Sequence, residues 1–135
     1  EEINWKHAQG SWEPIVLAPR RVPYREITTL YGMADAVIVS SLHDGMNLVA
    51  KEFVSCRADG EGVLILFRFT EAARELDGAL LVNPYDRGDM AAAIAAALSL
   101  PAGERRRRMK KMREKVRANN IFRWAGKILQ ELARI

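Results

Sequence analysis

Two carboxylates bracket the expected start of a helix in this 135-residue chain. Asp44 lies beside Gly45 in a tight turn after an apolar run, residues 36–39, and Glu52 follows about two helical turns later. The first N–H groups of a helix have no partner within it, so such a turn can bind phosphate or sugar oxygens. Carboxylates beside the turn can accept hydrogen bonds from hydroxyls, and Glu52 could take both hydroxyls of a ribose. Together these features indicate a nucleotide-sugar site.

The turn also offers backbone groups to a ligand. Gly45 can adopt a positive φ, which allows close approach of a ligand to the backbone. The N–H groups of Met46, Asn47 and Leu48 would then be free to bind oxygen atoms. Asp44 would accept a hydrogen bond from a sugar hydroxyl, although an Asp before a glycine is also a common turn residue.

Hydrophobic patterns predict the elements that position this turn. Four apolar runs are typical of buried parallel strands, and the last two of central ones: 14–18, 36–40, 63–67 and 79–82. Helical segments separate them, which predicts an α/β fold with a Rossmann-like parallel sheet flanked by helices on both faces. Ligands of such sheets bind at the carboxyl ends of the strands, where the turn also lies.

The helices are expected at residues 23–34, 47–56, 70–76 and 87–100, with two further helices at 104–117 and 121–133. In the second helix we expect Leu48, Val49, Phe53 and Val54 to be buried. Asp86 should cap the fourth helix, because an Asp side chain accepts hydrogen bonds from first-turn N–H groups.

Composition excludes several classes of protein. The chain is 49% hydrophobic and 28% charged, which is ordinary for one globular domain spanning residues 1–135. No run approaches the roughly 20 apolar residues of a membrane span, and the first residues lack a signal-peptide pattern. We therefore predict a cytoplasmic protein with no membrane partner. Cys56 should be a packed thiol, no His/Cys cluster indicates a metal, and an oligomer is compatible with the sequence.

Charge is concentrated in the last two helices. Residues 104–135 carry twelve basic and three acidic side chains, against nine and fourteen in the rest. This segment could be a nucleic-acid or partner-binding patch, centred on residues 105–117. Met109, Met112 and Val116 recur at helical spacing, however, and no aromatic residues alternate with the bases for stacking. The pattern favours a solvated helix face over nucleic-acid binding.

The first 12 residues are less informative, but Trp5 and Trp12 suggest packing.

The nine residues Asp-Gly-Met-Asn-Leu-Val-Ala-Lys-Glu at 44–52 closely resemble the trehalose-6-phosphate synthases and their glucosylglycerol-phosphate synthase relatives. The two acids, separated by seven residues, resemble the acidic element of retaining glycosyltransferases built from two Rossmann-like domains, the GT-B type. Segments 22–35, 79–86 and 119–124 agree with the same family. The resemblance extends from about residue 12 to the end, and it implies part of the carboxyl-terminal, donor-binding domain of such an enzyme.

The resemblance also implies a role for each motif position. Asp44 would bind a hydroxyl of the donor glucose and is the candidate catalytic residue. Six further positions would hold the nucleotide sugar, through backbone amides, through packing beneath the phosphate or, at the last one, through a carboxylate on the ribose. They are Gly45, Met46, Asn47, Leu48, Val49 and Glu52. His43 and Lys51 are interpreted as a loop residue and a surface or ion-paired residue.

The implied reaction moves glucose from UDP- or GDP-glucose to glucose 6-phosphate with retention, giving trehalose 6-phosphate, without cofactor or metal. The acceptor domain and a basic pair for the diphosphate would lie outside this chain, so we expect no transfer by the chain alone. Relatives tend to have serine at Phe67 and glycine at Glu71, where the carboxylate adds negative charge near the phosphate region. Alternative functions are a glucosylglycerol-phosphate synthase, a non-catalytic nucleotide-sugar-binding or regulatory module, and a basic nucleic-acid or partner-binding module.

Overall fold

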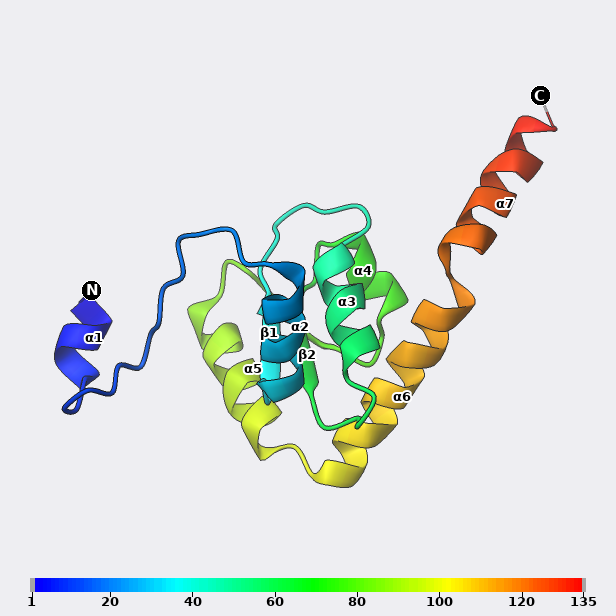
Figure 1. Ribbon diagram of the computed structural model, residues 1–135. Helices are drawn as coiled ribbons and strands as arrows, with labels where there is room; N and C mark the ends of the chain where they lie inside the picture. The colour runs from blue at the N-terminus through cyan, green and yellow to red at the C-terminus, as the bar shows by residue number, and fades with distance from the viewer. Residues whose placement is uncertain (1, 135) are drawn as a thin grey trace.

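The computed structural model describes residues 2–134, in which helices and strands alternate through the middle of the chain (Figure 1). In order, the elements are α1 (Glu2–His7), α2 (Tyr24–Met33), β1 (Ala36–Val39), α3 (Leu48–Cys56), β2 (Val63–Phe67), α4 (Glu71–Glu75), β3 (Leu80–Val82), α5 (Arg87–Ser99), α6 (Ala102–Ala118) and α7 (Ile121–Leu132). None of the helices in this part of the chain is long and apolar enough to cross a membrane.

The described sheet has three parallel strands in the order β1-β2-β3. All five residues of β2 are buried, which confirms the predicted central strand. Among residues 2–134, β3 pairs with β2 alone and its Leu81 is 43% exposed, so β3 is an edge strand of the described sheet and the prediction that it is central is wrong. The α/β class with a parallel sheet is confirmed.

The predicted strand at residues 14–18 does not form. Its backbone pairs with a side chain instead of a neighbouring strand, because Ile15 N–H donates to Asn4 Oδ1 at 3.0 Å and Asn4 Nδ2 donates to Ile15 O at 2.7 Å. Val16 and Leu17 are exposed. The expected packing of Trp5 and Trp12 is also wrong, since both side chains are exposed.

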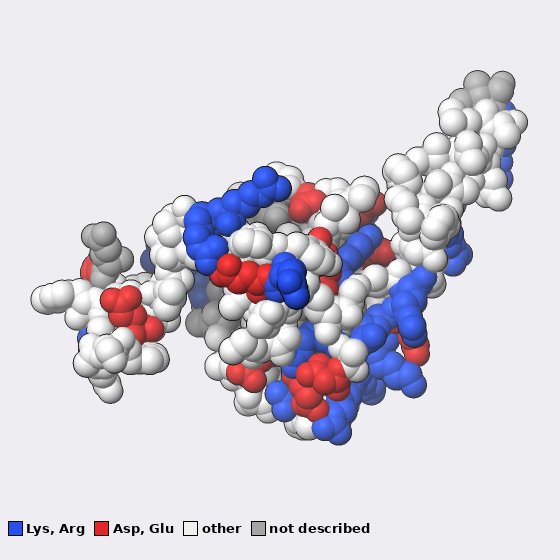
Figure 2. Space-filling model, viewed as in Figure 1, with Lys and Arg blue, Asp and Glu red and all other residues white. Residues whose placement is uncertain are grey.

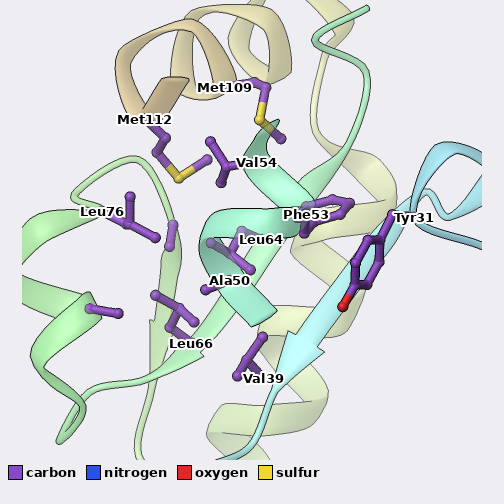
Figure 3. Packing of buried hydrophobic residues seen from close by; sticks show 12 residues of the cluster. Tyr31, Val39, Ala50, Phe53, Val54, Leu64, Leu66, Leu76, Met109 and Met112 are labelled. Carbon is purple, nitrogen blue, oxygen red and sulfur yellow. The ribbon is translucent and has the colours of Figure 1, made fainter. Parts of the chain in front are cut away.

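Helices cover both faces of the sheet because side chains alternate along β2. Val63, Ile65 and Phe67 pack against α5, with Ala97 buried among them. Leu64 and Leu66 face a larger cluster built from α2, α3, α4 and α6 (Figure 3).

Helix α6 is held against the body by two methionines. Met109 and Met112 are fully buried, and Val116 packs against the same cluster, which confirms the predicted apolar stripe (Figure 3). The helix also approaches the turn before β3 closely, because a Cβ at Gly78 would lie 2.7 Å from Arg108 O. Beyond α6 the chain projects away as α7, of which no described side chain is buried (Figure 1).

Helix α3 buries a different set of residues from the expected one. Phe53 and Val54 are buried as predicted, together with Ala50, but Leu48 and Val49 are 57% and 47% exposed. Residues three and four apart share one helix face, so burial of positions 50, 53 and 54 turns Leu48 to the opposite side, while Val49 lies at the edge of the buried face and stays partly exposed. The apolar character of Leu48 and Val49 therefore does not serve the core.

Candidate functional site

The motif lies where β1 ends, at the carboxyl edge of the sheet. The loop after β1 carries Asp44 and Gly45, and α3 starts directly behind it. The segment after the neighbouring strand β2 lies alongside, since Glu71 N–H donates to Asp44 O at 3.3 Å. The sheet order therefore brings two loops that are more than 20 residues apart into contact.

Asn47 sets the geometry of the turn. Its φ of 42° and ψ of 66° lie in the left-handed region, which Asn tolerates better than most side chains. Asn47 is the N-cap of α3, and its Oδ1 accepts from Ala50 N–H at 3.2 Å. The positive φ expected at Gly45 is thus wrong for that residue and occurs instead at Asn47, which is 1% exposed.

Asp44 supports this turn from within. Its Oδ1 accepts from Asn47 N–H at 2.9 Å, so the amide of Asn47 is not free for a ligand, contrary to the sequence expectation. Within residues 2–134, no acceptor pairs with the N–H groups of Met46, Leu48 or Val49. An unpaired helix start carries a partial positive charge, so these three amides form a place suited to anionic oxygen.

The two carboxylates of the motif differ in their surroundings. Glu52 is half-buried on α3 and has no ion-pair partner within the described residues. Burial raises the pKa of the Tyr31 hydroxyl, and the negative charge of Glu52 raises it further. Lys51, next to Glu52, pairs with Glu75 at 2.7 Å, which confirms its interpretation as an ion-paired residue.

Two open hollows adjoin the motif, and each is lined by different motif residues. Gly45 and Met46 line the larger one, of about 480 Å³, while Asp44 lines the second, of about 400 Å³. Glu71 and Arg74 line both hollows and so form the wall between them. The other four predicted donor-binding positions line neither hollow; they are Asn47, Leu48, Val49 and Glu52.

Arg74 is a cation that the sequence reasoning missed. No carboxylate of residues 2–134 lies within 4.0 Å of its guanidinium, although it stands beside the motif. The sequence shows only that Arg74 lies one helical turn after Glu71. The adjacency of β1 and β2, which brings α4 to this edge, is not visible in the sequence. Glu71 itself lies against the turn, with Oε2 3.8 Å from where a Cβ on Gly45 would be. Within the described residues, no group of three or more His, Cys, Asp or Glu could hold a metal ion.

Comparison with known proteins extends this picture to nearly the whole chain. The model of Glycosyltransferase family 20 matches residues 1–134. A bifunctional trehalose-6-phosphate synthase/phosphatase of Thermoproteus tenax is 42% identical over 130 residues, which are 96% of this chain and 18% of that protein. A glucosylglycerol-phosphate synthase of Pseudomonas anguilliseptica is also 42% identical, over 129 residues, which are 94% of this chain and 17% of that protein.

Solved structures agree in fold as well as in sequence. A UDP-forming alpha,alpha-trehalose-phosphate synthase of Burkholderia xenovorans, in complex with glucose-6-phosphate, superposes with a TM-score of 0.93 at 41% identity. The match covers 98% of this chain and 29% of that one, so the chain spans less than a third of the length of these relatives. The resemblance read from the motif is confirmed, and the chain belongs to glycosyltransferase family 20.

Proposed function

We propose that this chain supplies part of the donor site of a retaining, cytoplasmic glucosyltransferase. The reaction moves glucose from a nucleoside diphosphate sugar to glucose 6-phosphate and gives trehalose 6-phosphate, with no cofactor or metal. The chain provides the donor side. The acceptor is held by residues outside these 135 positions, in keeping with the share of the relatives that the chain covers.

The observation that carries the proposal is the open start of α3. The amides of Leu48 and Val49 are the anion site of this helix, and they face the diphosphate of the donor. Asp44 accepts from a hydroxyl of the glucose through the carboxylate oxygen that the turn leaves unused, since Oδ1 is held by Asn47 N–H. Glu52, which is free of ion pairs within the described chain, accepts from the ribose hydroxyls.

UDP-glucose is the favoured donor because the Burkholderia relative is UDP-forming. In the transfer, the glucose–phosphate bond breaks and negative charge develops on the departing diphosphate. Preoriented N–H groups stabilise such charge without reorganising. Arg74, which has no carboxylate partner among the described residues, adds a positive charge to the same edge.

Nuclear magnetic resonance titration of the 135-residue chain with UDP-glucose and GDP-glucose tests the proposal. We expect saturable shifts of the amides of Met46, Leu48 and Val49, with UDP-glucose binding more tightly. Asp44→Asn should weaken binding about tenfold, because a charged hydrogen bond is lost. Asp86→Asn at the start of α5 is the matched control and should bind as the unaltered chain does. Equal affinity in all three proteins would refute the assigned role of Asp44.

A second candidate acceptor has the same support from sequence. The glucosylglycerol-phosphate synthase relative is as similar to this chain as the Thermoproteus synthase, at 42% identity. The donor half of the reaction would be unchanged, and a glycerol phosphate would replace glucose 6-phosphate. Assay of a longer form of the protein with both acceptors distinguishes them, because only one should be consumed with UDP-glucose.

A further inference from the structure

The two flanks of α6 differ in how their positive charges are satisfied. The helix carries nine basic and two acidic side chains and lies along one side of the body (Figures 1 and 2). Because Met109 and Met112 face inward, the basic side chains of α6 lie on two flanks of the helix. One flank faces the turn at Asp77, and the other faces the loop at Ala58–Gly60.

On the first flank each carboxylate bridges two cations. Asp77 accepts from Lys111 at 2.8 Å and from Lys115 at 3.0 Å. Glu104 does the same for two arginines, each at 2.7 Å; they are Arg107 and Arg108. The hydrogen bonds from the two lysines lower the pKa of the Asp77 carboxyl. Each of the four cations on this flank, which we call the paired flank, therefore contacts a carboxylate within the chain.

The second flank holds four cations in a line, which we call the basic stripe: Arg106, Lys110, Arg113 and Arg117. Their spacing of four, three and four residues keeps them on one side of the helix, over a length of about 16 Å. Arg106 pairs with Glu61, but within residues 2–134 no carboxylate lies within 4.0 Å of the other three cations. Figure 2 shows Lys and Arg gathered along this helix.

The basic stripe borders hollows instead of a flat surface. One, of about 380 Å³, lies between the stripe and the loop at Ala58–Gly60, and a smaller one of about 130 Å³ is lined by Ser55. Arg113 and Arg117 line both. Two carboxylates, Asp59 and Glu114, also border the larger hollow; Asp59 pairs with Arg57, and Glu114 offsets part of the charge of the stripe. A partner can therefore insert carboxylates beside the helix, against a wall from α3 and the loop after it.

The chemistry of the partner follows from the paired flank. There, one carboxylate satisfies two cations about one helical turn apart, as Asp77 does. Two or three carboxylates at the same one-turn repeat would satisfy the basic stripe, and an acidic helix presents them at that repeat. The lining residues include no aromatic or amide side chain to stack on or read a base, which disfavours a nucleic acid.

We propose that the basic stripe of α6 is a docking surface for an acidic helical segment of a partner protein, whose carboxylates pair with Lys110, Arg113 and Arg117. The surface lies on a different helix from the donor motif and does not depend on the proposed glucosyl transfer.

Fluorescence anisotropy with a labelled helical peptide tests this surface in the 135-residue chain. The peptide carries Glu at positions i, i+4, i+7 and i+11 on an alanine background, and a matched peptide carries Gln at those positions. The stripe variant is Lys110→Gln, Arg113→Gln, Arg117→Gln. The control variant is Arg107→Gln, Lys111→Gln, Lys115→Gln, which removes the same charge from the paired flank. Circular dichroism establishes that both variants keep their helix content.

We expect the Glu peptide to bind in about 50 mM salt, because exposed ion pairs are individually weak and low salt limits their screening. The Gln peptide has no carboxylates to form these pairs and should not bind. The stripe variant should raise Kd roughly tenfold and the control variant less than threefold. Equal losses in the two variants would overturn the proposal, because bulk charge would then explain binding. Absence of Glu-peptide binding would overturn it too, as would tighter binding of a single-stranded oligothymidine of equal charge that depends on the stripe.

Discussion

Helices α3 and α5 both begin at the carboxyl edge of the sheet, and their first turns are built in opposite ways. At α5, Asp86 is extended and its carboxylate accepts from Gly88 N–H at 2.8 Å and from Asp89 N–H at 3.1 Å. Asp89 adds a second carboxylate to the same turn. Helix α5 thus supplies its own anions and satisfies its own donors.

Helix α3 has no acidic residue in its first turn. Its cap, Asn47, is left-handed, the side chain of Asn47 accepts from Ala50 N–H, and the carboxylate of Asp44 accepts from the amide of Asn47 itself. The amides at the helix start remain open, and their side chains face outward. Backbone strain, such as that at Asn47, and unsatisfied N–H donors are typical of positions where a ligand can bind. The difference separates a helix start satisfied within the chain from one that we propose to bind the donor.

The largest effect is expected from Asn47→Ala. This change removes the cap, worth about 1 kcal/mol, and replaces Asn, which tolerates the left-handed region, with Ala, for which that conformation costs about 1–2 kcal/mol. Unfolding in urea should show a loss of about 2–3 kcal/mol. Asn47→Gly is the matched variant and should lose less, because glycine adopts this φ freely. A larger loss for the glycine variant would show that the turn is not strained.

Substitution of Asp44 and of Asp86 distinguishes an effect on stability from an effect on donor binding. Asp86→Ala and Asp44→Ala should each lower the free energy of unfolding by about 1 kcal/mol, because each removes hydrogen bonds to a helix start or its turn. Only Asp44→Ala should abolish the response of the chain to UDP-glucose. Chemical denaturation and ligand titration of both proteins measure this, and a loss of binding in Asp86→Ala would erase the distinction between the helices.

Val49→Asp should make the start of α3 resemble that of α5. Val49 is 47% exposed, so the new carboxylate can meet the helix dipole without entering the core. The free energy of unfolding should rise by about 0.3–1 kcal/mol, while donor affinity falls through repulsion of the diphosphate. Val49→Asn is the uncharged control. If Val49→Asp bound UDP-glucose as tightly as the control, the open amides would have no part in binding the donor.

The smallest effect concerns a third helix start, that of α6, which has no side-chain cap bond. Hydrogen bonds from Arg107 and Arg108 lower the pKa of the Glu104 carboxyl to about 2 from its usual 4.5. A carboxyl with a lower pKa when folded stabilises the fold above its unfolded pKa, and this contribution is lost as the pH falls from about 4.5 toward 2. As the pH falls from about 4.5 toward 2, the melting temperature of Glu104→Gln should therefore decrease less than that of the unaltered chain. The difference should be small because Glu104 lies at the surface, where water screens its ion pairs.

Much of the fold could be predicted because its signals are local. The buried run at Val63–Phe67 and the cap at Asp86 behave as their sequences indicate, and both depend on the chemistry of a few adjacent residues. The apolar run at residues 14–18 gave the wrong element because a strand needs a neighbour, and the amide side chain of Asn4 occupies its backbone instead. The central place expected for β3 was wrong for a related reason, since a short apolar run does not reveal how many strands flank it.

The candidate site divides in the same way. By itself the sequence determined the family and the identity of the motif, because nine consecutive residues of fixed chemistry are a local property. Only the tertiary structure decided that Asn47 takes the left-handed conformation, that the amide of Asn47 is occupied by Asp44, and that Leu48 and Val49 face outward. It also brought Arg74 beside the motif, and it paired every cation on one flank of α6 with a carboxylate while leaving three on the other flank without one among the described residues. These outcomes depend on which strands pair and which helix faces pack, and such pairing is set by burial across the whole chain.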